Sequence, residues 1–214
     1  LSGIRNAFEV LKPYVPASSQ DARFIAMIER EIDRIGRIVR HMYCLYRPQA
    51  GQSEPVSFPA LLKDAADLMA RLAGARSVQL SVGAGAEPIE GLQPPEHLMQ
   101  ILLNLVRNAI EASPPGGTVR LEAAVVGETV VISVADQGAG IPEDLRNRVF
   151  EPFFSTKPSS GTTGMGLGLA ISRSLAESMG GSLSFESTPG QGTRFQLRVP
   201  RNHPVAVGDP TAAP

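Results

Sequence analysis

The fold is decided by the stretch Glu96-His97-Leu98-Met99-Gln100-Ile101-Leu102-Leu103-Asn104-Leu105-Val106-Arg107-Asn108-Ala109-Ile110-Glu111-Ala112. Its apolar residues recur every three or four positions, which is the period of an amphipathic helix. Asn104 and Asn108 are four residues apart, so they project from one face of that helix about one turn from each other. The stretch therefore predicts a helix with one buried side and two carboxamides on a common face.

Three further signals follow in a fixed order. Asp136-Gln137-Gly138-Ala139-Gly140 comes after a β-branched run at 129–134, then Phe150-Glu151-Pro152-Phe153-Phe154-Ser155-Thr156-Lys157, then Gly161-Thr162-Thr163-Gly164-Met165-Gly166-Leu167-Gly168-Leu169. With 96–112, these stretches resemble the N, G1, F and G2 boxes of the GHKL ATP-binding superfamily, in the form used by two-component sensor histidine kinases. One box alone would be weak support, but four in order are strong support.

The resemblance implies ATP and Mg²⁺ as cofactors and assigns their binding residues. Asn108 would be the principal Mg²⁺ ligand, with Asn104 supporting the same region as a second candidate, because Mg²⁺ takes oxygen ligands and an asparagine adds no charge beside phosphate. Lys157 would compensate charge on the phosphates, and these three are the candidate catalytic residues. Asp136 would accept a hydrogen bond from the adenine amine. The other candidate nucleotide-binding residues are Gly138, Gly140, Ile141, Gly164, Met165, Gly166, Leu167, Gly168 and Thr193.

Each of these residues also has a plain structural interpretation. Asp-x-Gly is common in turns, Lys157 could be an ordinary surface lysine, and Thr193 after Gly192 suits a simple turn. The glycines matter because backbone N–H groups at a helix start suit phosphate and because glycine allows close backbone approach. The presence of all four boxes favours the functional interpretation.

Position 104 bears on the type of reaction. Relatives that hydrolyse ATP with water carry a glutamate four residues before the magnesium asparagine, where it serves as general base. Asn104 cannot take a proton near neutral pH, and Glu111, one turn beyond Asn108, is a weaker substitute. The sequence therefore predicts phosphate transfer to a protein nucleophile.

The N-terminal part predicts an antiparallel helical hairpin over residues 1–47. Its second helix carries a heptad seam formed by Ile25, Ile28, Ile32, Ile35, Val39, Met42 and Tyr46. By resemblance this hairpin would form a homodimer and carry the phosphorylated histidine in a motif ending in Leu1, so that the acceptor would lie just upstream. His41, His97 and His203 lack that context, and none is assigned the acceptor role.

The remaining boundaries follow from composition. Residues 48–55 read as a linker, 56–200 as the catalytic ATP-binding domain, and 201–214, rich in Pro and Ala, as a disordered tail. Helices are expected at 58–73 and 166–179, and strands at 78–82, 118–126, 128–135, 182–187 and 192–199. The resulting fold class is α+β, a two-layer sandwich of a mixed, largely antiparallel sheet with helices on one face. No P-loop is present, and the glycine run follows a loop and not a strand, unlike a dinucleotide fingerprint.

The composition sets outer limits on function. A net charge of −1 over 214 residues gives no reason to expect nucleic acid or a polybasic anchor. Apolar runs are far shorter than the roughly 20 residues of a membrane span. The single Cys44 fits a reducing compartment, so a cytoplasmic location is expected.

The sequence thus predicts the core of an ATP-dependent protein-histidine kinase, which passes its phosphate to an aspartate on a response-regulator receiver domain. Two alternatives stay open: a GHKL serine kinase, and a non-catalytic nucleotide-binding scaffold that dimerises.

Overall fold

The computed structural model describes residues 27, 28, 30, 31, 52–83, 88–152, 154, 155 and 166–202. Of the expected hairpin it therefore describes only Met27, Ile28, Arg30 and Glu31, which are helical and exposed. The homodimer predicted through that hairpin lies outside the described residues. Among the helices that are described, none is long and apolar enough to cross a membrane.

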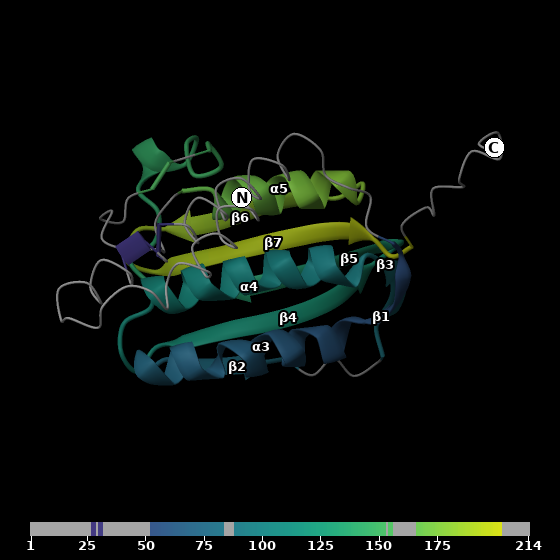
Figure 1. The fold of residues 1–214 in the computed structure, drawn as a ribbon, viewed down its shortest axis with the longest axis horizontal. Coiled ribbons are helices and arrows are strands. Elements are labelled where there is room, and N and C mark those ends of the chain that lie inside the picture. Colours follow the sequence, from purple (N-terminus) through teal and green to yellow (C-terminus); the bar gives the residue numbers. More distant parts are fainter. Residues whose placement is uncertain are drawn as a thin grey trace, which may run out of the picture.

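A five-stranded sheet forms the back layer of the domain (Figure 1). Its order is β2-β4-β5-β7-β6, with β2 parallel to β4 and every other pair antiparallel. The strands are β2 (Gln79–Val82), β4 (Thr118–Val126), β5 (Thr129–Ala135), β6 (Ser182–Thr188) and β7 (Gly192–Pro200). The prediction of a mixed, largely antiparallel sheet is confirmed.

Three helices lie side by side on one face of this sheet (Figure 1). They are α3 (Phe58–Ala75), α4 (Pro95–Ala112) and α5 (Gly168–Ser178). α5 ends where Gly180 adopts φ +69° and the Gly181 N–H donates to the Ala176 carbonyl at 2.9 Å, which is a glycine C-cap. Two of the helices begin with proline in their first turn, where its missing N–H costs nothing.

The core lies between the helices and the inner face of the sheet. The fully buried residues of α4 are spaced as its periodicity predicts, and they include Leu98, Ile101, Leu105 and Ile110. Alternate residues of the central strands meet them, namely Val119, Leu121, Val130, Ile132, Val134, Phe195, Leu197 and Val199. Truncating such a side chain to alanine typically costs about 2–5 kcal/mol, so this layer holds α4 firmly in place.

A second, two-stranded sheet closes one end of the domain and was not predicted. β1 (Glu54–Ser57) pairs antiparallel with β3 (Glu90–Gln93), although 54 and 55 were expected in the linker and 90–93 were given no structure. The chain also stays hydrogen-bonded past Pro200, since Arg201 Nε donates to the Glu90 carbonyl at 2.7 Å and Asn202 bridges to Leu92. Hydrogen-bonded strand structure is therefore described from 54 to 202, and the sequence had predicted the domain at 56–200.

Candidate functional site

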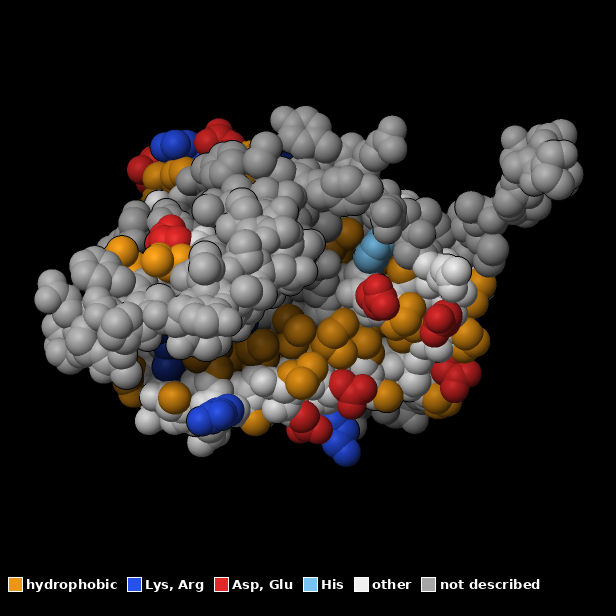
Figure 2. Space-filling model, in the orientation of Figure 1, with side chains coloured by type: hydrophobic (Ala, Val, Ile, Leu, Met, Phe, Trp, Pro, Cys, Tyr) orange, Lys and Arg blue, Asp and Glu red, His pale blue; other side chains and the backbone are white. Residues whose placement is uncertain are grey.

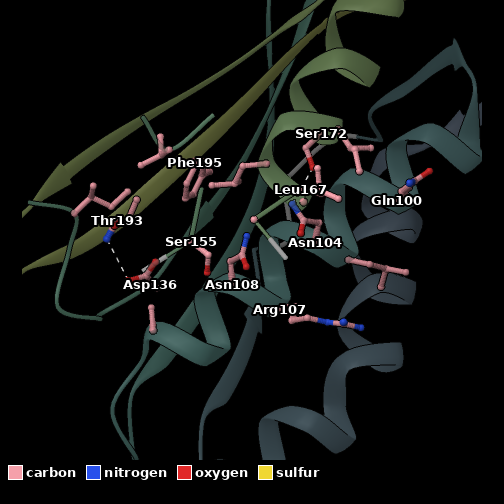
Figure 3. A pocket seen from close by; sticks show the side chains of 18 of the residues that line it. Gln100, Asn104, Arg107, Asn108, Asp136, Ser155, Leu167, Ser172, Thr193 and Phe195 are labelled. Atoms are coloured by element: carbon pink, nitrogen blue, oxygen red, sulfur yellow. Dashed lines mark hydrogen bonds between the residues drawn. The ribbon is translucent and has the colours of Figure 1, made fainter. Parts of the chain in front are cut away.

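A pocket of about 980 Å³ opens where α4 and α5 face the loops that follow β5 and precede β7 (Figure 3). Its walls include many of the predicted site residues, namely Asn104, Asn108, Asp136, Gly140, Ile141, Gly166, Leu167, Gly168 and Thr193. Gly138 lies behind the wall, against Ala112. Lys157, Gly164 and Met165 lie outside the described residues. The fold thus collects residues that are far apart in the sequence.

The pocket continues along the outer side of α3 and α4. There it is lined by apolar residues, among them Leu61, Met99 and Leu103. Figure 2 shows hydrophobic side chains gathered in a band across this face of the molecule, with charged side chains along its edges. The end of the pocket that holds Asp136 and Asn108 is therefore polar, and the α3–α4 side mixes apolar side chains with Asp64, Glu96, Gln100 and Arg107.

Asp136 is a buried carboxylate at the polar end. It follows the last residue of β5, and it is 9% exposed. Its Oδ1 accepts hydrogen bonds from the Gly138 N–H at 2.8 Å and the Thr193 N–H at 3.2 Å. Burial raises the pKa of Asp136 above its ordinary value, while these two backbone hydrogen bonds lower it and offset part of that effect. Both hydrogen bonds within the described part of the chain go to Oδ1, so Oδ2 keeps its capacity to accept another.

Close backbone approach around Asp136 requires glycine at two positions. Gly192 has φ +94°, and a Cβ there would collide with the Asp136 carbonyl oxygen. Gly140 has φ +73°, and a Cβ there would collide with the Thr188 carbonyl oxygen. Backbone atoms cannot move aside as a flexible side chain can, so both positions exclude larger residues.

The two asparagines of α4 have different surroundings. Asn104 Nδ2 donates to Ser172 Oγ of α5 at 2.9 Å, and its side chain lies directly against the backbone of Gly168, where a Cβ would collide with Oδ1. Asn108 points into the cavity (Figure 3) and makes no hydrogen bond to any residue that the structure describes. Asn104 therefore joins two helices, and Asn108 is the asparagine that remains available to a ligand.

Phenylalanines fix the segment that leads away from the pocket. Phe150 packs on Phe185 with ring centroids 5.8 Å apart, Phe185 packs on Phe195 at 5.6 Å, and the Arg173 guanidinium lies 5.4 Å from the Phe150 ring centre. Phe154 lies under the guanidinium of Arg148 at 4.4 Å. Phe150 thus anchors this segment by apolar packing, while Phe153 lies outside the described residues.

Two serines that support the site were missed in the sequence. Ser172 is 2% exposed and lies on the apolar face of α5, and Ser187 follows Leu183 and Phe185 on the inner side of β6. In each case a hydroxyl occupies a position where the periodicity calls for an apolar residue. A serine in an apolar position was the signal that could have identified both residues from the sequence, because a buried hydroxyl needs a hydrogen-bond partner.

The donor set indicates how a metal could be held. Within the described ranges no group of three or more His, Cys, Asp or Glu side chains is placed to hold a metal ion. Asn108 offers one carboxamide oxygen on the pocket wall. This suits Mg²⁺, which commonly takes one or two protein oxygens together with substrate phosphates and water.

Comparison with known proteins places this pocket in a family. The family described as histidine kinase-, DNA gyrase B-, and HSP90-like ATPase matches residues 93–203. The sensor histidine kinase ZraS of Escherichia coli (strain K12) is 32% identical over 202 residues, which are 94% of this chain and 43% of that protein. Sporulation kinase E of Bacillus subtilis (strain 168) is 31% identical over 92% of this chain and 27% of that protein. The chain therefore spans less than half the length of these curated relatives.

Solved structures agree with the fold. Full-length ShkA in complex with AMPPNP superposes with a TM-score of 0.76 at 28% identity, over 90% of this chain and 41% of that chain. The nucleotide-free catalytic domain of the histidine kinase ThkA gives a TM-score of 0.64 at 26% identity, over 71% of this chain and 97% of that domain. The two-layer α+β architecture is the one these proteins share.

Proposed function

The chain belongs to the family of histidine kinase-, DNA gyrase B- and HSP90-like ATPases, and from that membership we propose that its pocket binds Mg²⁺-ATP and donates the γ-phosphate to a histidine. The phosphate would then pass to an aspartate of a response-regulator receiver domain. Since ATP is the proposed substrate, we place this reaction in the cytoplasm. The relatives' names support the kinase assignment.

The hydrogen bonding of the Asp136 carboxylate is the observation that best supports ATP binding. Its Oδ1 is held by two backbone N–H groups, and Oδ2 keeps a free lone pair at the pocket wall. A buried acceptor held in this way favours a ligand that brings a donor, because an unmatched polar group in such a site is costly. The exocyclic amine of adenine is such a donor.

The phosphates would lie at the opposite side of the polar end. Asn108 and Asn104 line that side, together with the residues that begin α5, Gly166 to Gly168. Asn108 would hold Mg²⁺, which when bound neutralises charge on the phosphates, and backbone N–H groups at the start of α5 would face negative charge. Lys157 remains the predicted cationic partner.

Transfer to a protein nucleophile, and not to water, is supported by the surroundings of Asn104. Its carboxamide is bound to Ser172 and cannot accept a proton. Glu111 does not line the pocket, and Glu96, which does, precedes Asn104 by two helical turns. The position four residues before Asn108 thus carries no general base to activate water.

The decisive test is a phosphorylation assay on a chain extended upstream of Leu1. It would be incubated with γ-labelled ATP and Mg²⁺, and the labelled protein treated with acid and with base. Acid-labile, base-stable label is expected, because a phosphohistidine hydrolyses in acid. Acid-stable label would instead indicate a serine kinase, free phosphate without labelled protein an ATPase, and bound nucleotide without turnover a scaffold.

A further inference from the structure

Ser187 lies at the centre of a hydrogen-bond network behind the adenine end of the pocket. Its Oγ is 2.8 Å from the Ile141 nitrogen, 2.9 Å from Thr193 Oγ1 and 3.1 Å from the Gly192 carbonyl oxygen. Its own carbonyl accepts a hydrogen bond from Arg146 Nη2 at 2.7 Å. Ser187 does not line the pocket, so whatever it does there it does through these partners.

Counting donors assigns a direction to each bond. A serine hydroxyl has one hydrogen and two acceptor lone pairs. The Ile141 N–H takes one lone pair, and the hydrogen of Ser187 goes to the Gly192 carbonyl, which can only accept. All three contacts are hydrogen bonds at once when the hydrogen between Ser187 and Thr193 comes from Thr193, whose hydroxyl then donates away from the pocket.

The direction of the Thr193–Ser187 hydrogen bond determines which hydrogen-bonding groups Thr193 presents to a ligand. Thr193 is 7% exposed, lines the pocket, and donates its backbone N–H to Asp136 Oδ1. With its hydrogen committed to Ser187, Thr193 Oγ1 offers only lone pairs. The spare oxygen of Asp136 is also an acceptor, so these two side chains present acceptors alone to this end of the pocket. A 6-amino donor placed against these acceptors is matched, and a 6-oxo acceptor placed there is not.

We infer that Ser187 is a positioning residue that sets purine specificity by holding the Thr193 hydroxyl as an acceptor. The inference rests on the proposed function, because it assumes that a purine nucleotide occupies the pocket. Without the Ser187 hydroxyl, the Thr193 O–H can rotate and donate to a 6-oxo group. The Ile141 N–H and the Gly192 carbonyl lose a partner at the same time.

The test compares ATP with inosine triphosphate, which differs only in replacing the 6-amino group by a 6-oxo group and protonating N1. Calorimetry with Mg²⁺ would measure both affinities for the wild type, Ser187→Ala and Ser187→Thr. Ser184→Ala is the matched control, because Ser184 lies on the same strand but is exposed. We expect the ATP-to-ITP affinity ratio to fall about tenfold in Ser187→Ala, as for one hydrogen bond, and to stay near wild type in Ser187→Thr and Ser184→Ala.

A structural role alone would weaken both nucleotides equally and lower the melting temperature, leaving the ratio unchanged. An ATP-to-ITP affinity ratio that is unchanged in Ser187→Ala overturns the inference, and so does a ratio that falls in Ser187→Thr. If Ser187→Ala does not fold, Ser187→Cys, whose thiol is a weak hydrogen-bonding group, should lower the ratio, and an unaltered ratio overturns the inference. A wild type that binds neither nucleotide removes the proposed function as well, whereas preferential ATP binding with an unchanged ratio removes the inference only.

Discussion

The carboxylate of Asp136 is held in a balance between burial and hydrogen bonding. Burial raises its pKa, and the N–H groups of Gly138 and Thr193 lower it without cancelling the shift. A charge buried in this way costs stability in the free protein, and a ligand that brings a donor recovers part of that cost. Affinity and stability should therefore respond in opposite directions to a change at this residue.

Asp136→Asn tests this opposition. An amide can present its oxygen to Gly138 and Thr193, but its NH₂ then faces the adenine amine, donor against donor. We expect ATP affinity to fall by about 2 kcal/mol, roughly 30-fold, as for a hydrogen bond to a charged group. The melting temperature without ligand should be unchanged or higher. Calorimetry and thermal unfolding check both, with exposed Asp67→Asn as the control, and unchanged affinity would refute adenine recognition by Asp136.

The raised pKa of Asp136 also predicts a pH dependence. Because the folded-state pKa lies above the unfolded one, the stability contributed by this group is present at low pH and is lost as pH rises through the folded pKa. ATP requires the charged form as acceptor, so affinity should fall as pH drops from neutral through that pKa. The check is to measure ATP affinity as a function of pH. We expect a flatter profile in Asp136→Asn, and its remaining slope comes from the titration of ATP itself. Parallel profiles would contradict the assignment.

Sequence could predict some residues of the site and not others for a physical reason. Asp136 and Asn108 stand in short motifs, so the resemblance of those motifs to known ATP-binding boxes was enough to assign both residues to the site. Ser172 bonds a residue 68 positions away, and Ser187 meets Thr193 only because β6 pairs with β7 in that register. Such partners exist only once the fold has brought the elements together.

Among the connecting elements, the turn into β7 is the most constrained. Gly192 combines φ +94° with a collision between any Cβ and the Asp136 carbonyl, whereas Gly127 in the β4–β5 turn has φ +61° and open space around it. Gly127→Ala should cost about 1 kcal/mol, the price of the left-handed conformation alone. Gly192→Ala should cost more than about 2 kcal/mol, because backbone must also move. Urea unfolding compares the two variants, and equal losses would show that the close approach is unimportant.

The contact between α4 and α5 depends on the pair Asn104 and Ser172. Ser172→Ala removes the acceptor of the Asn104 amide and should cost about 1 kcal/mol. In an Asn104→Ala background the same change should cost almost nothing, since the bond is already lost, so the cycle should give a coupling of about 1 kcal/mol. Urea unfolding of the four proteins measures it. Additive losses would mean that the two side chains do not support each other.

At the scale of helices and strands, the sequence predicted those elements whose apolar residues recur with a clear period. The helix at 58–73 is observed as Phe58–Ala75, and the strands at 118–126 and 192–199 agree within a residue. β1 and β3 were missed because each has four residues and few buried ones, so alternation is too short to register. Their pairing depends on the return of the chain at Arg201 and Asn202, which is not a local property.

For the molecule as a whole, the described part of the proposed ATP site draws on residues from Asn104 to Thr193. The predicted dimer seam lies at 25–46, where Ile28 is helical and 41% exposed. An isoleucine so exposed gains by burial against a partner. The two properties, nucleotide binding and dimerisation, should therefore be separable by mutation.

Ile28→Asp together with Ile35→Asp tests this separation. Two charges in the seam would have to be buried unpaired in a dimer, so light scattering should show a single-chain mass where the wild type shows two. ATP affinity should stay within about twofold, as for independent sites. Arg30→Ala, a change on the same helix off the seam, should leave the mass unchanged. A double variant that remains dimeric would place the interface elsewhere, and one that loses ATP binding would show that the hairpin contributes to the nucleotide site.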